Sequence, residues 1–536
     1  MGLSQLPSEV LLQIMNILID PYQNADSKRS SQRANNFESL MYSNKRFQKL
    51  GETFSYQAFI QNSSNTLRKF IRALLSDPIR QRIVQTIDIK FIPEHSRSLS
   101  KLESLRRRAG FLNSESTYTQ EQLDQIKPYL DSLNLPPKVN LKWLREIQDG
   151  SWAAEAALII AILPNLREIR IRNCTKEFAE NKSLINIALS TGRLRWPGKT
   201  LGKLSLRSEV QDGTTNSHDL RRMTLEDIVS DTLFNTSIHT LELLNMRKQT
   251  LVSGTRDQLA QLQQSEAVDT FWVQNTRVKF PFKGLHLREC NLPASTLQSL
   301  LLASPKLESL VYEHKLVQPE FKFTLEFFIK HIDHLKSTLR ELEIYQPRRW
   351  ETNETAVPEI QPACSLLTFE KLQNLSISAN LVTSLIAPKD DQIFPSNNIN
   401  FETARNENSA SNFSDSLPPS ITELKIVDCD LKEVSPPIFE LLDHKFDFPK
   451  LKLIVLVARK TGHKETRPED AGFTMDPTDS DSSEELSDTE NEKDIEKTEF
   501  EERRRMESSV RNELEIAAWE NDVKLEIIVG GRPSTV

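Results

Sequence analysis

An apolar motif of fixed internal spacing recurs along the chain and limits the folds that the chain can adopt. Each copy has an apolar residue, a second one three positions later and a third two positions after that, as in Leu166, Ile169 and Ile171. The last two positions alternate as they do in a strand with one buried face. From Ile169 onward the middle residues follow one another at intervals of 25 to 49 residues. The ten copies are Val84/Ile87/Ile89, Leu166/Ile169/Ile171, Leu201/Leu204/Leu206, Ile238/Leu241/Leu243, Phe282/Leu285/Leu287, Leu307/Leu310/Tyr312, Leu339/Leu342/Ile344, Leu372/Leu375/Ile377, Ile421/Leu424/Ile426 and Leu451/Ile454/Leu456.

Stretches with helical periodicity lie between these predicted strands. We expect helices at Trp152–Leu163, Leu220–Leu233, Ala294–Leu302, Phe323–Leu335 and Pro437–Leu442, and then a helix at Arg503–Trp519 before a last strand at Val523–Val529. Strands and helices that alternate in this way predict an α/β fold with a mainly parallel sheet.

This cadence resembles leucine-rich repeats in a long and irregular form. Cys174, Cys290, Asn380 and Cys429 each follow the third apolar residue of their motif by three positions. Leucine-rich repeats place Asn or Cys in that slot, where the side chain satisfies the turning backbone. The resemblance implies a curved solenoid with outer helices. The irregular spacing is also compatible with an α/β domain that has no repeats.

A solenoid presents the solvent side of its strands as one long face, which binds macromolecules by area and shape. The charges that we expect on this face have both signs and form no uniform basic stripe of the kind that follows phosphates. We therefore expect a target protein as the ligand, and we do not expect nucleic acid. The expected side chains are Glu168, Arg170, Arg172, Glu242, His286, Arg288, Glu308, Glu313, Glu341, Glu343 and Lys425.

The first sixty residues have a different pattern. Residues 6–19 predict a helix that begins at Pro7 and is apolar on nearly every side, so that two of its sides should be buried. A polar insert at 22–36 precedes a second amphipathic helix at 37–50, and aromatic residues cluster at 54–60.

These segments, with the runs LPSEVLLQIMNIL, SNKRFQKL and FSYQAF, resemble an F-box, a short helical module. The resemblance implies that the module docks on a Skp-type adaptor and so joins a cullin-based ubiquitin ligase. The residues that would pack on the adaptor or complete the module are Leu6, Pro7, Val10, Leu11, Ile14, Leu18, Leu40, Phe47 and Leu50. The alternative is an ordinary helical hairpin that packs on its own domain.

These patterns give a predicted domain organisation. The predicted parts are an F-box-like module at 3–62, a helical linker with the first repeat at 63–160, a repeat array at 161–459 with a disordered insertion at about 388–418, an acidic disordered insertion at 460–498, and the last helix and strand of the array at 499–536.

Acidic residues are concentrated in one segment. Residues 476–502 contain thirteen acids and two lysines, whereas the net charge of the whole chain is −7. Such a composition predicts a disordered, solvated loop inside the last repeat. Ser482, Ser487 and Thr489 each have an acid three residues later, the pattern that acidophilic kinases prefer, so regulation by phosphorylation is a second interpretation. A histone-like basic partner is a third.

No arrangement of residues predicts catalysis, and we expect no cofactor and no metal. The run Gly198–Thr200 approximates a P-loop, but five residues separate it from Gly192 where the motif has four, and a predicted strand follows in place of a helix. His331 and His334 lack partners at zinc-site spacing, and Cys364 has no predictable base beside it. The longest apolar run, Ala156–Leu163, is too short to cross a bilayer.

Taken together, these features predict a non-catalytic, intracellular protein of the cytoplasm, the nucleus or both. Four cysteines form no disulfide framework, and no secretory signal is evident. The best hypothesis is the substrate-recognition subunit of an SCF-type ubiquitin ligase, with a Skp-type adaptor, a cullin and an unknown target protein as partners. The alternative is a leucine-rich-repeat scaffold without a role in ubiquitin ligation.

Overall fold

A computed structural model describes the strand-bearing part of the chain. The described residues are 10–11, 13, 45, 47, 56–61, 64–91, 118–174, 178, 183–195, 201–208, 238–245, 279–290, 292, 294–314, 324–346, 364–385, 412–458, 505 and 507–529. The chain divides into two compact units. Unit 1 comprises Met1–Phe321 with Val536, and unit 2 comprises Lys322–Thr535.

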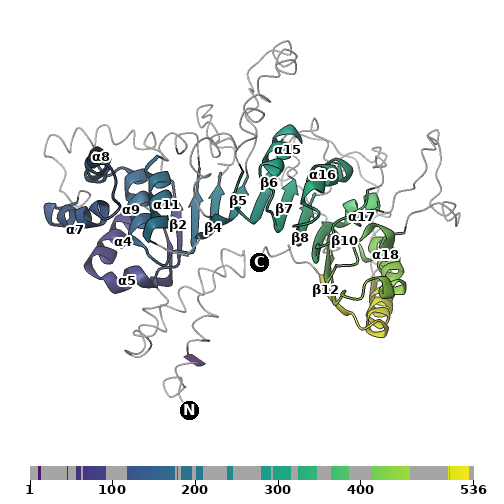
Figure 1. Ribbon diagram of the computed structural model, residues 1–536. Coiled ribbons are helices and arrows are strands. Elements are labelled where there is room, and N and C mark those ends of the chain that lie inside the picture. Colours follow the sequence, from purple (N-terminus) through teal and green to yellow (C-terminus); the bar gives the residue numbers. More distant parts are fainter. Residues whose placement is uncertain are drawn as a thin grey trace, which may run out of the picture. The chain divides into compact units, whose positions relative to one another are not determined.

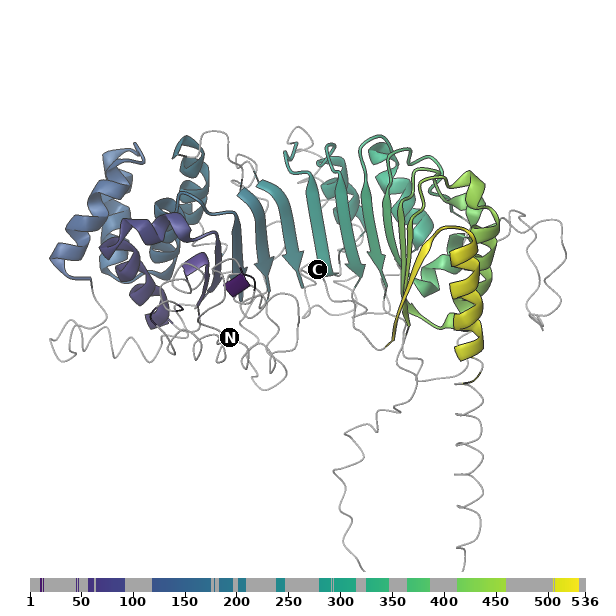
Figure 2. The same ribbon diagram turned by 90° about the horizontal axis from the view of Figure 1, so that it is seen from below.

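Unit 1 contains parallel strands that pair in the order in which they occur along the chain, and they lie side by side in Figure 2. This order is the one that a stack of strand–helix repeats produces. The strands are β1 (Ala58–Ile60), β2 (Thr86–Lys90), β3 (Glu168–Arg172), β4 (Leu201–Arg207), β5 (Ile238–Leu244), β6 (Gly284–Cys290) and β7 (Ser309–His314).

The predicted motifs set the register of this sheet. Within each unit the middle apolar residue of a motif lies opposite the middle residue of the next motif, so that one apolar row crosses the strands of that unit. Every residue of the ten motifs, in both units, is at most 4% exposed. The alternation in the sequence therefore defines the buried face, and the predicted strands are confirmed. In unit 1 the row consists of Ile87, Ile169, Leu204, Leu241, Leu285 and Leu310.

Helices fill the connections of unit 1. They are α4 (Ser64–Ser76), α5 (Pro78–Ile83), α7 (Gln120–Asp131), α8 (Pro137–Gln148), α9 (Trp152–Ile162), α11 (Ser183–Arg195) and α15 (Ala294–Leu302). Helix α9 is the centre of this group, since α4, α8 and α11 all pack against it. All of its residues are buried, which explains why its sequence is apolar on every side.

The helix boundaries follow local capping chemistry. The Thr119 hydroxyl accepts a hydrogen bond from the backbone N–H of Gln122, and the Gln122 side chain accepts one from the backbone N–H of Thr119, so α7 begins in a capping box. Asp77 caps α5 in a similar way, and Pro78 occupies the first helical position, where no N–H is needed.

Unit 2 repeats the same design. Its parallel strands are β8 (Glu341–Tyr345), β9 (Asn374–Ser378), β10 (Glu423–Cys429), β11 (Leu453–Ala458) and β12 (Lys524–Val529). Its helices are α16 (Leu325–Ile332), α17 (Ala379–Leu385) and α18 (Leu431–Asp443), with 3-10 turns η4 (Asp333–Leu335), η5 (Ser414–Ser416) and η6 (Lys445–Asp447), and residues 507–520 form a last helix. Figure 1 shows these helices on one side of the unit 2 strands. The apolar row here consists of Leu342, Leu375, Leu424, Ile454 and Leu525.

Most of the predicted helices are present. Helices α9, α15 and α16 lie where we expected them, and the last predicted helix and strand correspond to residues 507–520 and β12. The predicted helix Leu220–Leu233 lies outside the described residues. Helix α18 begins six residues before the predicted start at Pro437, because Asp430 caps it and the helix tolerates Pro436 and Pro437 in its interior.

Two segments differ from the predictions. Residues 58–60, which the sequence assigned to the helical module at 3–62, form β1 and pair with β2. Residues 412–418, assigned to the disordered insertion at 388–418, are ordered, because Phe413 and Leu417 are buried at 1% exposure. The Ser416 hydroxyl also donates to the backbone oxygen of Leu385, at 2.7 Å. Residues 388–411 of the predicted insertion lie outside the described part.

Candidate functional site

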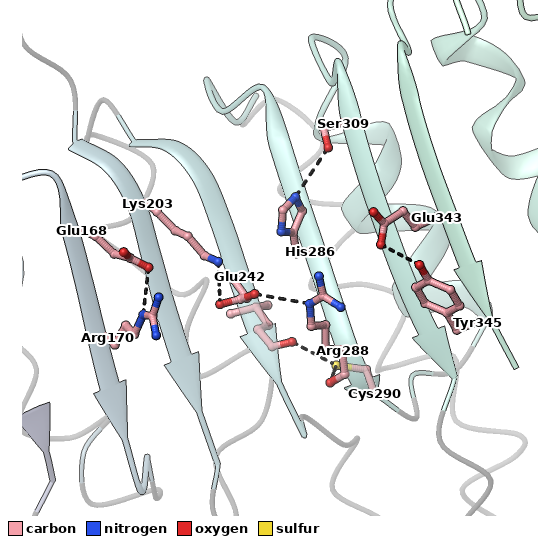
Figure 3. Close-up of polar contacts among 11 residues, drawn as sticks. Glu168, Arg170, Lys203, Glu242, His286, Arg288, Cys290, Ser309, Glu343 and Tyr345 are labelled. Carbon is pink, nitrogen blue, oxygen red and sulfur yellow. Dashed lines mark hydrogen bonds and ion pairs between the residues drawn. The ribbon is translucent and has the colours of Figure 1, made fainter. Parts of the chain in front are cut away.

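The polar face of the strands in each unit is the candidate site. Along every strand the residues between the buried apolar positions point to the opposite side, as strand geometry requires. In unit 1 most of these side chains are charged, and several pair with one another across neighbouring strands (Figure 3). We describe the two units separately.

Two ion pairs lie on β2 and β3. The Nε atom of Arg172 is 2.6 Å from Oδ1 of Asp88, on the neighbouring strand, and its Nη2 donates to the backbone oxygen of Gln61 at 3.1 Å. The Nε atom of Arg170 is 2.8 Å from Oε1 of Glu168 on the same strand. Both arginine side chains are half-buried, so these pairs orient the guanidinium groups on the face.

A denser cluster lies on β4, β5 and β6. Glu242 stands between two cations: Nζ of Lys203 is 3.1 Å from Oε2, and Nε of Arg288 is 3.4 Å from Oε1. Burial favours the neutral form of Glu242, but Lys203, a hydrogen bond from Ser205 and Arg288 outweigh it, so the pKa of Glu242 lies below its usual value. The carboxylate is therefore ionised at neutral pH and partly neutralises the cations around it.

His286 extends this cluster toward β7. Its Nε2 is 3.5 Å from Oγ of Ser309, and its buried Nδ1 has no hydrogen-bond partner among the described residues. Burial, together with the positive charge of Lys203, lowers the pKa of His286 to about 4. The imidazole is thus neutral at physiological pH and adds no charge to the face.

The register brings basic residues into one row, which we call the basic row: Lys90, Arg172, Arg207 and Arg288. Lys90 lies opposite Arg172, and Arg172 lies opposite Arg207. Leu244 then separates Arg207 from Arg288. We expected no uniform basic stripe, and Leu244 does interrupt this row, but the sequence analysis did not predict that four basic residues would gather in it. Each of these residues directly follows the third position of a motif, so the sequence places them at equivalent positions, but only the register makes them neighbours.

Unit 2 has a different face. The Tyr345 hydroxyl donates to Oε2 of Glu343 at 3.0 Å and lies 2.8 Å from Oγ of Ser376. Three valines, Val427, Val455 and Val457, form an apolar cluster on β10 and β11, and Tyr345 and Leu453 pack against it. This face is thus less basic than that of unit 1.

The strand ends use side chains to satisfy the backbone, as the leucine-rich-repeat resemblance implies. Sγ of Cys174 donates to the backbone oxygen of Ile171 at 3.3 Å, and Sγ of Cys290 donates to that of Arg288 at 3.2 Å. Cys429 is buried at the equivalent position, and Asn380 lies in the first turn of α17.

The asparagines beside this slot were not predicted. Asn173 and Asn245 have φ values of 62° and 58°, in the left-handed region that Asn tolerates better than most residues. Their side-chain amides donate to the backbone oxygens of Phe91 and Ser208, at the end of the preceding strand.

The residues predicted to form the adaptor site are described only in part. Val10 and Leu11 are helical; Val10 is 38% exposed, whereas Leu11 is 2% exposed. Phe47 is helical as well and 4% exposed. The other predicted adaptor residues (Leu6, Pro7, Ile14, Leu18, Leu40 and Leu50) and the possible phosphorylation sites (Ser482, Ser487 and Thr489) lie outside the described residues.

The other residues that the sequence analysis considered for a metal site or for catalysis have local structural partners. His331 and His334 make hydrogen bonds through Nδ1 to backbone oxygens one turn earlier. Cys364 donates to the backbone oxygen of Ser384, and burial raises its pKa to about 12. Among the described residues, no group of three or more His, Cys, Asp or Glu side chains is arranged to hold a metal ion. In the same part of the chain, no helix combines the length and the apolarity that a membrane span needs.

Comparison with known proteins finds no family model that matches this chain and no curated protein that is similar to it.

Proposed function

We propose that this chain is a non-catalytic recognition subunit that binds a target protein on the polar face of its parallel strands. The observation that carries this proposal is the continuous register of the motifs, which keeps the apolar residues on the helix side and leaves a wide polar face on the other. Such a face suits a macromolecular ligand, which binds over a large area.

For the N-terminal residues we propose docking on a Skp-type adaptor, and through it on a cullin ubiquitin ligase. This part of the proposal rests on the sequence resemblance to an F-box. It agrees with the helical conformation of Val10, Leu11 and Phe47 and with the exposure of Val10. The receptor would then act by proximity, because it holds a lysine of the target close to a charged conjugating enzyme. It would do so in the cytoplasm or the nucleus.

A second candidate is a repeat scaffold without a ligase role. The burial of Leu11 and Phe47 favours the scaffold, since both side chains are almost fully buried within this chain and are therefore not available to a partner. In that case the first helix caps the unit to which it belongs.

Val10 and Gln13 allow a matched test, because both are exposed on the same helical segment and only Val10 is expected to contact the adaptor. The full-length chain is co-expressed with a Skp-type adaptor and a cullin, and capture is compared for the wild type, Val10→Glu and Gln13→Glu. We expect capture by the wild type and Gln13→Glu, and its loss in Val10→Glu. If the folded wild type captures no adaptor, the chain is a scaffold.

A further inference from the structure

We infer that the basic row of unit 1 binds an acidic, Asp/Glu-rich segment of a partner protein. This inference rests on the proposed function in one respect, since it names the class of ligand that the polar face recognises.

The charge of the face is the first argument. The residues of β2–β6 that alternate with the buried apolar positions comprise six cations and three anions, and the exposed Glu289 at the irregular end of β6 lowers their net charge from +3 to +2. The cations are Lys90, Arg170, Arg172, Lys203, Arg207 and Arg288, and the anions are Asp88, Glu168 and Glu242. The three anions all pair with cations of the same face, and cations remain in excess on it.

Accessibility is the second argument, and it identifies the central residue. The side chain of Arg207 is exposed and makes no ion pair or hydrogen bond with the described residues. On the neighbouring strand, Arg172 is held by Asp88 with its side chain 29% exposed. Arg288 is almost buried beside Glu242 and supports the row through its charge. A carboxylate that arrives from solvent therefore meets Arg207 first, and guanidinium groups bind carboxylates through two parallel hydrogen bonds.

The dimensions of the row suit an extended segment. Neighbouring strands lie about 4.8 Å apart, so the five strands from β2 to β6 span about 19 Å. An extended chain rises about 3.3 Å per residue and covers this distance with about six residues. A short acidic run can thus place several carboxylates along the row.

The same face is poorly suited to nucleic acid. Leu244 interrupts the cations, and the carboxylates of Asp88 and Glu242 lie next to the row, where they would repel a continuous phosphate backbone. No outward-facing residue on the described strands β2–β6 is a Phe, Tyr or Trp, which single-stranded binders use to stack bases. The acids of a protein segment can instead be spaced so that they match the cations.

The test uses the full-length chain and a fluorescent peptide of alternating Glu and Ser, about eight residues long, which exceeds the length of the row. The control ligands are the same peptide with Gln in place of Glu and a single-stranded DNA of similar length. We expect binding of the Glu peptide alone, and a loss of that binding in about 0.5 M salt, where charges are screened within a few ångströms.

Two charge reversals locate the site. Arg207→Glu should weaken binding of the Glu peptide at least ~10-fold, which corresponds to a difference of about 1.4 kcal/mol. Lys425→Glu changes the net charge of the chain equally, but on β10 of unit 2, and should weaken binding less than ~2-fold. Circular dichroism and the thermal midpoint confirm that both variants are folded.

Three outcomes overturn the inference. The first is that the folded wild type does not bind the Glu peptide, and the second is that the two variants lose equal amounts of peptide binding. The third is that the wild type binds the DNA more tightly than the Glu peptide and that Arg207→Glu abolishes this DNA binding. Capture of the adaptor is measured separately on the same samples. Peptide binding without adaptor capture would reject the ligase role and support the inference of an acidic ligand. Adaptor capture without peptide binding would reject the acidic ligand and leave the ligase role in place.

Discussion

Nε of Arg68 on α4 lies 2.6 Å from Oε1 of Glu155 on α9, and the two side chains are only 8% and 2% exposed. Nη2 of the same arginine donates to the backbone oxygen of Gly150 at 3.2 Å. Because α9 is otherwise apolar, this pair is the charged contact that joins α4 to the loop before α9 and to α9 itself. Two predictions depend on it.

Glu155→Ala should destabilise unit 1 by about 3–5 kcal/mol, since Arg68 would keep its charge in a buried site without the carboxylate that neutralises it. The double variant Arg68→Met/Glu155→Leu should recover most of this loss, because well-packed apolar side chains replace buried pairs at little cost. Urea unfolding followed by circular dichroism measures both.

The exposed pair Arg511–Glu515 is a matched control for this prediction. Its Nε–Oε1 distance is 2.8 Å, but each side chain is 47% exposed. We expect Glu515→Ala to cost less than about 1 kcal/mol. If Glu155→Ala and Glu515→Ala lower the free energy of unfolding by similar amounts, burial does not determine the strength of the Arg68–Glu155 contact.

Gly150 is the second position that depends on Arg68. Its φ is 74°, and a Cβ atom there would lie 2.7 Å from Nη2 of Arg68. Gly150→Ala therefore adds backbone strain to a collision with the ion pair, and we expect a loss of about 1–3 kcal/mol. Gly150→Asn separates the two causes, because Asn tolerates this φ but has the same Cβ. If Asn is as stable as Gly, the collision contributes nothing.

Sequence patterns predicted the strands because each strand buries one face, and this burial requires apolar residues at alternate positions. Leu241 and Leu285 are 44 residues apart in the chain, yet they lie opposite one another, and both could be assigned from local spacing alone. The buried cysteines at the strand ends followed from the same alignment. Local alternation is thus enough where a residue's environment is set by its own strand.

The features that depend on pairing between strands could not be read in this way. The basic row requires Arg172 and Arg207 to be neighbours, which only the register establishes. Strand β1 has three residues in an aromatic cluster, too few to show alternation, and its partner β2 defines it. Helix α18 was predicted too short because Pro436 normally ends a helix, whereas here the buried face that includes Val434 and Ile438 compensates.

Acid should destabilise unit 1 through two histidines. Burial lowers the pKa of both His286 and His314 to about 4, whereas the unfolded chain takes up these protons near pH 6.5. The contribution of the two neutral histidines to the free energy of unfolding is therefore fully present above pH 6.5. It decreases as the pH falls from 6.5 to 4, by on the order of 3 kcal/mol for the buried His314. His314→Gln should flatten the pH dependence of the thermal midpoint in this window.

His444 provides a control, because its pKa is shifted in the opposite direction. It is exposed, and a hydrogen bond to the backbone oxygen of Glu440 raises its pKa. Its contribution to stability is present below pH 6.5 and disappears as the pH rises through the folded pKa. His444→Gln should therefore leave the acid loss between pH 6.5 and 4 intact. An acid loss that persists in the double variant His286→Gln/His314→Gln would assign it to carboxylates.

The four cysteines should be nearly unreactive in the native protein. Cys174, Cys290 and Cys429 are buried, and the half-buried Cys364 has a pKa raised to about 12, first by burial and then by Glu326. Because the thiolate is the reactive species, little of Cys364 is available at pH 8. A thiol reagent such as Ellman's should label the native chain slowly and should find four thiols after unfolding in guanidinium. Fast labelling of one thiol per native chain, abolished by Cys364→Ser, would contradict this prediction, because it would require the contact between Cys364 and Ser384 to open readily.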